Sequence, residues 1–336
     1  MNKVLVVGSY VQDLTFNTEK FPVEGETVVG EFTSGHGGKG SNQAIAAARL
    51  GSDVFFIGCV GEDVFGNEVG EFLAEENIEA QIFFSNKPTG AASIIVDKEG
   101  KNSIVVSLGA NKELNGYNVK EFVQDLGLEF DVILTQLEAG RDTQSIEQIL
   151  YLKWFSDENK ISILNPAPMS NIFNESILSL IDIITPNETE FISLYNRVSG
   201  EGAHISIFDN TYLVSCQEDI AKMCECLEIP YIVITMGERG VFLYSYINKD
   251  YRIFPSLKVE VKSTAGAGDA FSGALASFLA KSENRILLAS NFIETLIEGV
   301  KFSIVASGLS VTKEGTSPSM PYIEEVEQAL NTYAHI

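Results

Sequence analysis

Short apolar runs rich in Val and Ile alternate along the chain with segments in which apolar residues recur at helical spacing. Most runs are apolar at nearly every position, which is typical of parallel strands covered by helices on both faces of a sheet. We predict strands at residues 4–7, 54–57, 132–134, 161–164, 181–184, 232–235 and 257–261. Predicted helices include residues 41–50, 67–76, 143–155, 219–227 and 270–280. This order indicates an α/β fold with a doubly wound, mostly parallel sheet flanked by helices.

Two stretches depart from this alternation. Residues 27–32 and 82–106 have the pattern of consecutive strands joined by turns such as 97–100. Strands without helices of their own need another cover, so we expect a small antiparallel sheet that acts as a lid. The prediction is a single domain, residues 1–336, with a lid from roughly 11–35 and 82–108 inserted in it. Residues 196–216 are polar in patches and indicate a loop.

Composition and charge limit the classes of partner. The chain has 336 residues, 45% of them hydrophobic, and a formal net charge of −23, which argues against binding nucleic acid or an anionic membrane. No apolar run approaches the roughly 18–20 residues of a spanning helix, and the apolar start is too short for a signal peptide. Cys59, Cys216, Cys224 and Cys226 have no disulfide or metal-site spacing. We therefore expect a cytoplasmic protein with reduced thiols and small-molecule ligands.

The segment 264–271 is the most informative for chemistry, because small residues there follow a predicted strand and open a predicted helix. Free N–H groups and the helix dipole at such a start suit the charge on a transferring phosphoryl group. Asp269, in the same turn, can take a proton from an attacking hydroxyl. Asp269 can equally be a helix N-cap, with Gly266 and Gly268 forming a tight turn. This segment alone does not decide between the two interpretations.

A second glycine-rich segment, residues 35–43, also leads into an alanine-rich helix. Lys39 is followed by Gly40 rather than Ser or Thr, so the segment is not a Walker A loop. Lys39 and Asn42 can hydrogen-bond several hydroxyl groups of a ligand. The alternative is a flexible turn with a solvated lysine.

Polar residues also follow several other predicted strands, where ligands of open parallel sheets collect. In the segment 185–190, Asn187 and Glu190 lie on one helical face and can hold the water shell of Mg²⁺, although a first helical turn enriched in acids is common. Residues 165–168 and 235–240 complete the set of strand ends. There is no GxSxG nucleophile elbow, no GxGxxG after the first strand, and no metal-type spacing of histidines.

Six segments resemble, in order, those of ribokinase and its relatives, the PfkB-type sugar kinases. The resemblance runs from Val4 to about Glu325 and rests on residues 8–13, 21–27, 37–44, 165–168, 185–190 and 266–269. It implies transfer of the ATP γ-phosphoryl group to a sugar hydroxymethyl oxygen, with ribose or a related pentose as the first candidate. It also implies a homodimer formed through the lid sheets.

The resemblance also implies roles for individual residues. Asp269 would be the catalytic base in a catalytic segment that starts at Gly266, and the amides of Ala267, Gly268 and Asp269 would form an anion hole. The residues that would bind the sugar are Asp13, Gly38, Lys39, Asn42, Glu138 and, from the lid, Ala92, Ile94 and Ile104. The residues that would bind the nucleotide are Asn187, Thr235, Gly237, Gly240 and Thr264. Glu190 would hold Mg²⁺ through water.

Four departures from the ribokinase pattern affect this interpretation. Val11 replaces an Asn that contacts the sugar, and leaving one ribose hydroxyl unpaired costs about 1–3 kcal/mol. Ser263 replaces an Asp that helps to bind an activating monovalent cation, and a neutral serine is a poorer K⁺ ligand, although Ser310, Gly315 and Ser319 fit that region. The chain is also longer between Glu190 and Thr235 and between Asp269 and Gly315.

Two alternatives to a pentose kinase therefore stay open. Val11 motivates a kinase of the same family that acts on a nucleoside or a hexose. Ser263 and the two longer segments motivate a non-catalytic sugar-binding or regulatory protein that retained the fold, since a fold alone does not guarantee activity.

Overall fold

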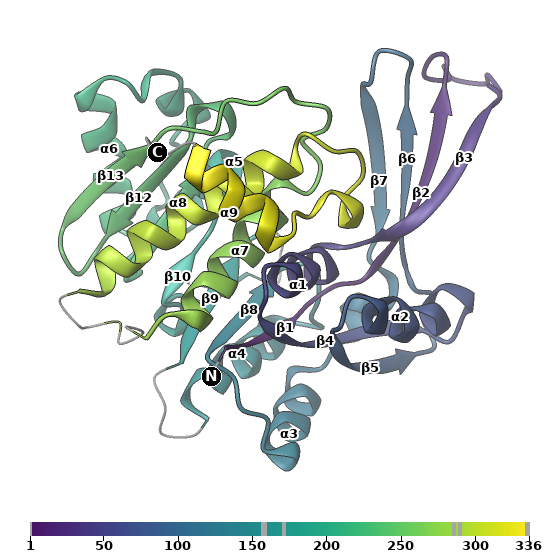
Figure 1. Cartoon of the computed structure of the whole chain (residues 1–336), viewed down its shortest axis with the longest axis horizontal. Coiled ribbons are helices and arrows are strands. Elements are labelled where there is room, and N and C mark those ends of the chain that lie inside the picture. The colour runs from purple at the N-terminus through teal and green to yellow at the C-terminus, as the bar shows by residue number, and fades with distance from the viewer. Residues whose placement is uncertain (1, 156–159, 170–172, 284–286, 288–290, 333–336) are drawn as a thin grey trace.

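The computed structural model of the chain describes residues 2–155, 160–169, 173–283, 287 and 291–332. Its larger sheet consists of β1 (Lys3–Val7), β4 (Asp53–Gly61), β5 (Glu79–Ser85), β8 (Val132–Gln136), β9 (Ile161–Asn165), β10 (Ile183–Ile184), β11 (Tyr231–Thr235), β12 (Val241–Ser245) and β13 (Asp250–Phe254). The strand order is β13-β12-β11-β10-β9-β8-β1-β4-β5 (Figure 1). Neighbours from β5 to β11 pair in parallel, and β12 and β13 add an antiparallel edge. The predicted doubly wound, mostly parallel sheet is confirmed.

Helices cover both faces of this sheet (Figure 1). They are α1 (Lys39–Arg49), α2 (Val64–Glu75), α3 (Gly116–Leu126), α4 (Thr143–Leu150), α5 (Glu188–Ser199), α6 (Val214–Glu225), α7 (Ala267–Lys281), α8 (Phe292–Ser310) and α9 (Ile323–Thr332). Apolar residues of α1, α2, α7, α8 and α9 belong to one core cluster, and those of α3 to α6 belong to the other. The sheet separates the two clusters.

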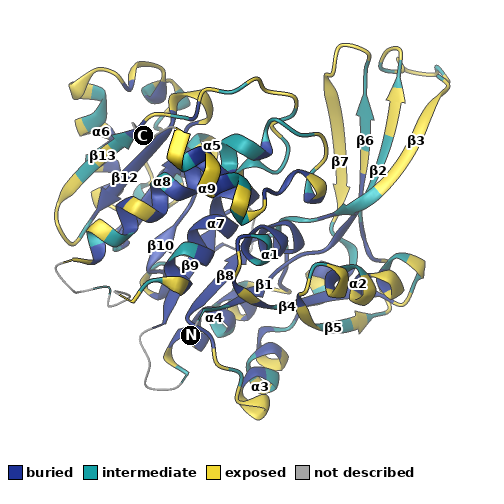
Figure 2. Ribbon diagram, viewed as in Figure 1, coloured by how far each residue is buried: buried dark blue, intermediate teal, exposed yellow. Residues whose placement is uncertain are grey.

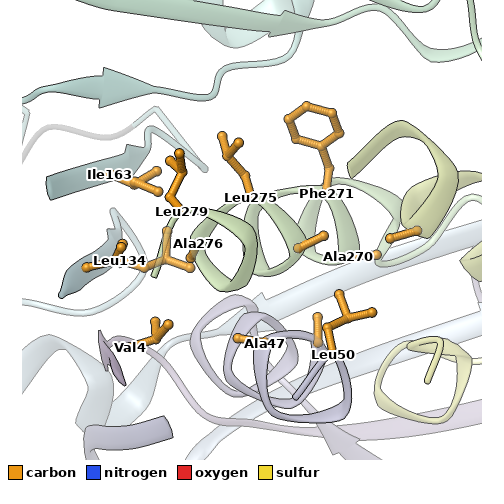
Figure 3. Close-up of a cluster of buried hydrophobic side chains, with 14 of the residues drawn as sticks. Val4, Ala47, Leu50, Leu134, Ile163, Ala270, Phe271, Leu275, Ala276 and Leu279 are labelled. Atoms are coloured by element: carbon orange, nitrogen blue, oxygen red, sulfur yellow. The ribbon is translucent and has the colours of Figure 1, made fainter. Parts of the chain in front are cut away.

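Alternation along each strand supplies both clusters. Val4 and Val6 of β1 pack in the cluster with α1 and α7, whereas Leu5 and Val7 pack in the opposite one. Figure 3 shows strand residues such as Leu134 facing Ala276 and Leu279 of α7. Burial of each such aliphatic side chain contributes about 1.5–3 kcal/mol, so strands that are apolar on both faces fix the position of the helices that carry the site.

The smaller sheet stands out from one side of the larger one (Figure 1). It consists of β2 (Val11–Thr18), β3 (Gly30–Gly37), β6 (Gly90–Val96) and β7 (Asn102–Ser107), in the order β3-β2-β6-β7. We call it the lid sheet. Its central pair, β2 and β6, is parallel, so the prediction of a wholly antiparallel sheet is wrong. Much of its surface is exposed (Figure 2).

Several predicted boundaries are wrong. The segment 257–261 is not a strand in the described structure. Its Leu257 is buried because it packs against α8, where a Cβ atom added at Gly308 would lie 2.6 Å from the Leu257 Cβ. Residues 82–85 pair with β4 in the larger sheet and do not belong to the lid sheet.

Helix boundaries also differ from the predictions. The helix predicted at 143–155 ends at Leu150 and continues as a 3₁₀ turn, Tyr151–Trp154. The predicted loop 196–216 contains the end of α5, a 3₁₀ turn at Ile205–Asn210 and the start of α6. No helix among the described residues is long and apolar enough to span a bilayer. The four cysteines are free.

Candidate active site

The site lies where the strand order reverses, between β1 and β8, at the carboxyl ends of the parallel strands. Ligand sites of doubly wound sheets form at this position because the connections leave the two strands in opposite directions. A cleft of about 1420 Å³ adjoins a smaller cavity of about 180 Å³. Asn187, Thr235, Thr264 and Gly268 line both, so the two spaces meet.

Two helices begin at the site, each after a glycine in the left-handed region. Gly38 precedes α1 with φ 101°, and Gly266 precedes α7 with φ 79°. No side chain caps either helix, so their first N–H groups need other partners. In α1 these partners are present within the protein, since the Lys39 N–H donates to Glu138 (3.0 Å) and the Gly40 N–H donates to the Ser9 hydroxyl (3.3 Å).

The N-terminus of α7 is different. The Ala267 N–H donates to the Thr264 carbonyl over a long 3.3 Å, while the next two N–H groups, of Gly268 and Asp269, lie in the unpaired first turn. Gly268 is exposed and lines both cavities. The start of α7 is therefore the place where an anion can receive backbone hydrogen bonds and the favourable end of the helix dipole.

Asp269 lies one residue further along α7 and is only 6% exposed. Its Oδ2 accepts from the Asn42 side-chain amide and its Oδ1 from that of Gln43, both at 3.0 Å. Burial raises the pKa of Asp269, opposed by Lys39 and by these two hydrogen bonds. A buried carboxylate with a raised pKa beside a cavity suits a general base. The alternative interpretation as an N-cap is wrong, because Gly266 occupies that position.

Lys39 is surrounded by carboxylates. Burial disfavours its ammonium, but Asp269, Glu138 and Glu190 together outweigh burial and raise the pKa of Lys39. Burial also raises the pKa of Glu138, whose Oε2 accepts from the Ser9 hydroxyl at 2.5 Å. Lys39 lines the smaller cavity together with Asp269 and Glu190. The cavity thus combines one cation with several acceptors, a combination suited to hydroxyl groups and to a phosphoryl group.

Asp13 lies on β2, opposite the start of α1. Its Oδ2 accepts from the Thr316 hydroxyl at 3.2 Å, and a Cβ atom added at Gly37 would lie 2.4 Å from this oxygen. Burial raises the pKa of Asp13 to about 6, with Glu138 and Asp269 adding to the increase. Strand register pairs Asp13 with Ala92.

The other predicted lid residues share the face of Asp13. Ile94 lies two residues after Ala92 on β6, and side chains two apart on a strand point to the same face. Ile104 of β7 is paired with Ile94 and therefore lies on this face as well. Ala92 is buried, whereas Ile104 is 48% exposed. Asp13 and the three apolar residues therefore present a polar position bordered by an apolar surface.

The large cleft brings together all five predicted nucleotide residues. Thr235, Gly237 and Gly240, which follow β11, line it along with Asn187 and Thr264. Its apolar lining comes in part from residues that the sequence analysis did not assign: Val241, Leu257, Val259, Ile304 and Val311. The incorrectly predicted strand 257–261 thus forms one wall of this cleft.

Asn187 and Glu190 form a capping box at the start of α5. The Glu190 N–H donates to Asn187 Oδ1 and the Asn187 N–H donates to Glu190 Oε2, both at 2.8 Å. The spacing of three residues between Asn187 and Glu190 is therefore explained by the first turn of the helix, which was the alternative to a Mg²⁺ site. Glu190 still lines the smaller cavity, and burial raises its pKa.

The residues assigned to a monovalent cation are engaged locally. The Ser263 Oγ accepts from the Ala265 N–H at 3.2 Å. The Ser310 and Ser319 hydroxyls donate to the carbonyls of Ser307 and Thr316. Among the residues that the structure describes, no group of three or more His, Cys, Asp and Glu side chains is placed to hold a metal ion.

Four further residues belong to the site but were not assigned from the sequence. Gln43 and Asn165 lie within segments that the sequence analysis singled out, and both contact the Asp269 network. Thr316 and Ser317 lie at the start of a 3₁₀ turn, Ser317–Ser319, before α9 and contact Asp13 and Asn42 respectively. Nothing in the local sequence pattern indicated Thr316 and Ser317. Each lies far along the chain from its partner, by 303 and 275 positions respectively, and only the fold brings the partners together.

Adjoining cavities that meet at an open helix start and a buried carboxylate have the arrangement that a phosphotransferase needs. The family model described as pfkB family carbohydrate kinase matches residues 1–323. The chain therefore belongs to the pfkB family of carbohydrate kinases, which confirms the predicted family and class of enzyme.

Individual relatives agree with this assignment. Ribokinase of Haemophilus influenzae is 33% identical over 335 residues, which cover 98% of this chain and 99% of that protein. Deoxyribokinase of Salmonella typhimurium is 30% identical over 334 residues and 98% of each protein. The structure of Arabidopsis thaliana ribokinase complexed with ribose and ATP has a TM-score of 0.77 and 26% identity, covering 98% of both chains.

Proposed function

We propose that the protein transfers the γ-phosphoryl group of ATP to the hydroxymethyl oxygen of a pentose. The observation that carries the proposal is the position of Asp269, where the cavity beside Lys39 meets the nucleotide-sized cleft. The ribokinase complexed with ribose and ATP supports the choice of both substrates.

In the proposed reaction, the sugar oxygen forms a bond to the γ-phosphorus while its proton passes to Asp269. The bond from the γ-phosphorus to the bridging oxygen breaks, and its electron pair leaves with ADP. The N–H groups of Gly268 and Asp269 donate to the phosphoryl oxygens at the start of α7. Lys39 contributes positive charge between the base and Glu138.

The sugar is held from two sides. Asp13 and Glu138 accept hydrogen bonds from its hydroxyls, and the Gly38 backbone, Lys39 and Asn42 complete the polar side. Ala92, Ile94 and Ile104 cover its apolar face from the lid sheet. Closure of the lid sheet would exclude water, which otherwise competes with the sugar as acceptor of the phosphoryl group.

Mg²⁺ fits this site as part of the nucleotide complex rather than as a resident ion. The described residues offer no three-ligand cluster, and Mg²⁺ is commonly bound through one or two carboxylates plus substrate phosphates. Glu190, which lines the smaller cavity, would contact its water shell, with Asn187 beside it. When bound, Mg²⁺ would neutralise part of the charge on the phosphates.

A 2-deoxypentose is the second candidate substrate. Val11 lies two residues before Asp13 on β2 and is buried, so its side chain shares the face of Asp13 and offers no hydrogen bond. A sugar that lacks one hydroxyl loses nothing at such a position. The similarity to a deoxyribokinase supports this candidate.

A substrate panel tests the proposal. ADP release is measured with ATP and ribose, 2-deoxyribose, a nucleoside or a hexose, and the phosphorylated product is identified by mass. We expect a pentose to give the highest kcat/KM. Higher kcat/KM with a nucleoside or hexose would transfer the assignment to that substrate, and no sugar-dependent ADP release with any of them would favour the non-catalytic alternative.

We also propose that two copies associate through the lid sheets. The face opposite Asp13 carries Phe16 and Phe32, paired in register with ring centroids 5.1 Å apart, and Val105, which is 72% exposed. Exposed apolar sheet surface of this kind commonly forms an interface.

A further inference from the structure

Asp269 Oδ1 lies at one end of a chain of buried side-chain amides. The Gln43 Nε2 donates to this oxygen at 3.0 Å and to Asn165 Oδ1 at 3.1 Å. The Gln43 Oε1 accepts from Gln136 Nε2 at 2.6 Å. Gln43 and Gln136 are both fully buried. The mechanism above uses neither of them.

A backbone carbonyl fixes the orientation of this chain. The Asn165 Nδ2 donates to the Thr185 carbonyl at 2.7 Å, and a carbonyl oxygen can only accept. Asn165 must therefore turn its Oδ1 toward Gln43, which must turn its Nε2 toward Asn165. Both N–H groups of Gln43 are then used, one on Asn165 and one on Asp269. Gln43 cannot offer its oxygen to Asp269 without losing the bond to Asn165.

Gln136 shows that this orientation is maintained at a cost. Because Gln43 presents its oxygen to Gln136, Gln136 must donate its Nε2 and point its own Oε1 elsewhere. That Oε1 is the buried side-chain atom without a hydrogen-bond partner among the described residues. It faces Gly8, where an added Cβ atom would lie 2.1 Å away. An unpaired buried oxygen is retained only where the surrounding structure determines it.

The other oxygen of Asp269 has a reversible partner. Asn42 donates to Oδ2, and the Asn42 Oδ1 lies 2.7 Å from the Ser317 hydroxyl. Ser317 also lies 2.8 Å from the His36 carbonyl, to which it can donate while accepting from Asn42. Asn42 can therefore turn over and accept a hydrogen bond from Asp269 Oδ2, whereas Gln43 can only donate.

We infer that Gln43 is a positioning residue for Asp269, fixed as a donor by Asn165, and that the substrate proton is received on Oδ2. The inference rests on the proposed function. As the bond between the sugar oxygen and the γ-phosphorus forms and the bond to the bridging oxygen breaks, the proton moves to Oδ2 and Asn42 reverses. Oδ1 keeps its hydrogen bond from Gln43 throughout, so the carboxylate does not rotate.

The first test compares two isosteric substitutions at neighbouring buried glutamines. Gln43→Met removes the donor to Oδ1, and loss of a hydrogen bond to the charged form raises a carboxyl pKa. We expect the acid limb of the kcat profile to move up by about one to two pH units, with little change in the KM of the sugar. Gln136→Met retains the hydrogen bond from Gln43 to Asn165, which fixes Gln43 as a donor. The acid limb of the kcat profile should therefore stay in place in this variant. The inference would be overturned if Gln43→Met did not move the acid limb of the kcat profile, or if Gln43→Met and Gln136→Met moved it equally.

Asn165→Leu tests the direction of the chain. This substitution does not remove any atom that contacts Asp269, but it allows Gln43 and Gln136 to turn over together. We expect the acid limb to move upward as in Gln43→Met. An unchanged limb in a folded variant would contradict the role given to Asn165.

A readout without turnover separates this inference from the proposed function. The unfolding free energy of each protein is compared with that of its Asp269→Asn counterpart from pH 4, near the ordinary pKa of an aspartate, upward. Because the folded pKa of Asp269 is raised, the Asp protein loses stability relative to its counterpart as pH rises through that pKa. In Gln43→Met the loss should continue to higher pH than in the wild type. Coincident curves would refute the role of Gln43 even if the enzyme were active. Separated curves would support the hydrogen bond from Gln43 that fixes Oδ1, whereas retained activity in Asp269→Asn would refute the proposed function and with it the proton transfer to Oδ2.

Discussion

The Asn42 side-chain amide donates to Asp269 Oδ2 at 3.0 Å, although 227 positions separate the two residues. This bond joins the start of α1, which follows the lid strand β3, to the start of α7. One contact to the proposed base therefore comes from the helix that we propose to bind the sugar. Only Gly38 separates β3 from α1, so one loop residue and one side chain connect the lid sheet to Asp269.

Substitution of Asn42 by Asp tests this relationship. The new carboxylate would face Asp269 and Ser317, so two acceptors would meet where a donor is needed. We expect kcat/KM for the sugar to fall about 100-fold, since an unmatched pair at a reacting group costs about 3 kcal/mol. Asn17→Asp, on an exposed part of β2, adds the same charge away from the site and should leave kcat/KM near the wild-type value. Equal losses in both variants would assign the effect to net charge.

Asp13 should make sugar binding sensitive to pH. Burial raises the pKa of this carboxyl to about 6, so it becomes neutral as pH falls through that value. A neutral carboxyl is a weaker acceptor for sugar hydroxyls, and we expect the sugar KM to rise about tenfold from pH 7 to pH 5. Initial rates across this range measure it. In Asp13→Asn the KM should be high and independent of pH, and a sloping profile in that variant would assign the titration to another group.

The same carboxyl should destabilise the protein without ligand at neutral pH. Since its folded pKa lies above its unfolded value, its favourable contribution is complete at low pH and is lost as pH rises through about 6. Asp13→Asn should therefore unfold at higher urea concentration than the wild type at pH 8, by about 1–3 kcal/mol in the free energy of unfolding. The difference should disappear near pH 4. A variant less stable than the wild type at pH 8 would refute this account.

Potassium should have little effect on turnover. Ser263 is neutral and already accepts from the Ala265 N–H, and the Ser310 and Ser319 hydroxyls donate to backbone carbonyls. We expect kcat in K⁺ and in a large organic cation at equal ionic strength to agree within about twofold, because K⁺ sites are built from carboxylate and carbonyl oxygens. A strong dependence on K⁺ would show that backbone carbonyls around Gly315 suffice. Ser263→Asp is the matched gain-of-function variant and should introduce the dependence.

The proposed dimer can be disrupted at one pair of aromatic residues. Phe32 is 55% exposed and pairs with Phe16 on the face of the lid sheet opposite Asp13. Phe32→Lys should shift the molecular mass in light scattering from two copies to one, since a buried unpaired charge is costly at an apolar interface. Val29→Lys, at an exposed position before β3, is the control and should remain a dimer. A wild-type protein that is monomeric at micromolar concentration contradicts the proposal directly.

Sequence reasoning predicted the parts of the fold whose signal is local. Strands such as 4–7 and 132–134 are apolar on both faces and could be assigned without tertiary information. The segment 257–261 alternates apolar Leu257, Val259 and Val261 with charged Lys258 and Glu260, which is the pattern of a half-buried strand. In the structure this segment instead packs against α8 and borders the larger cleft, an environment that alternation cannot by itself distinguish from a sheet.

The same limit applies to the site. Asp269 and Lys39 were found because glycine-rich segments mark the starts of their helices. Thr316 and Ser317 carry no such mark, and their partners Asp13 and Asn42 lie far away in sequence. The spacing of Asn187 and Glu190 suggested a metal site, but the structure first explains it as a helix cap.

The central claim is that Asp269 takes the proton from the sugar while the start of α7 binds the phosphoryl group. Asp269→Asn tests it most directly, because it keeps the shape of the side chain and removes its basicity. We predict that kcat for sugar-dependent ADP release falls about 10²–10⁴-fold, while sugar affinity by calorimetry and the unfolding transition remain close to the wild type. Wild-type turnover in the Asn variant would contradict the account.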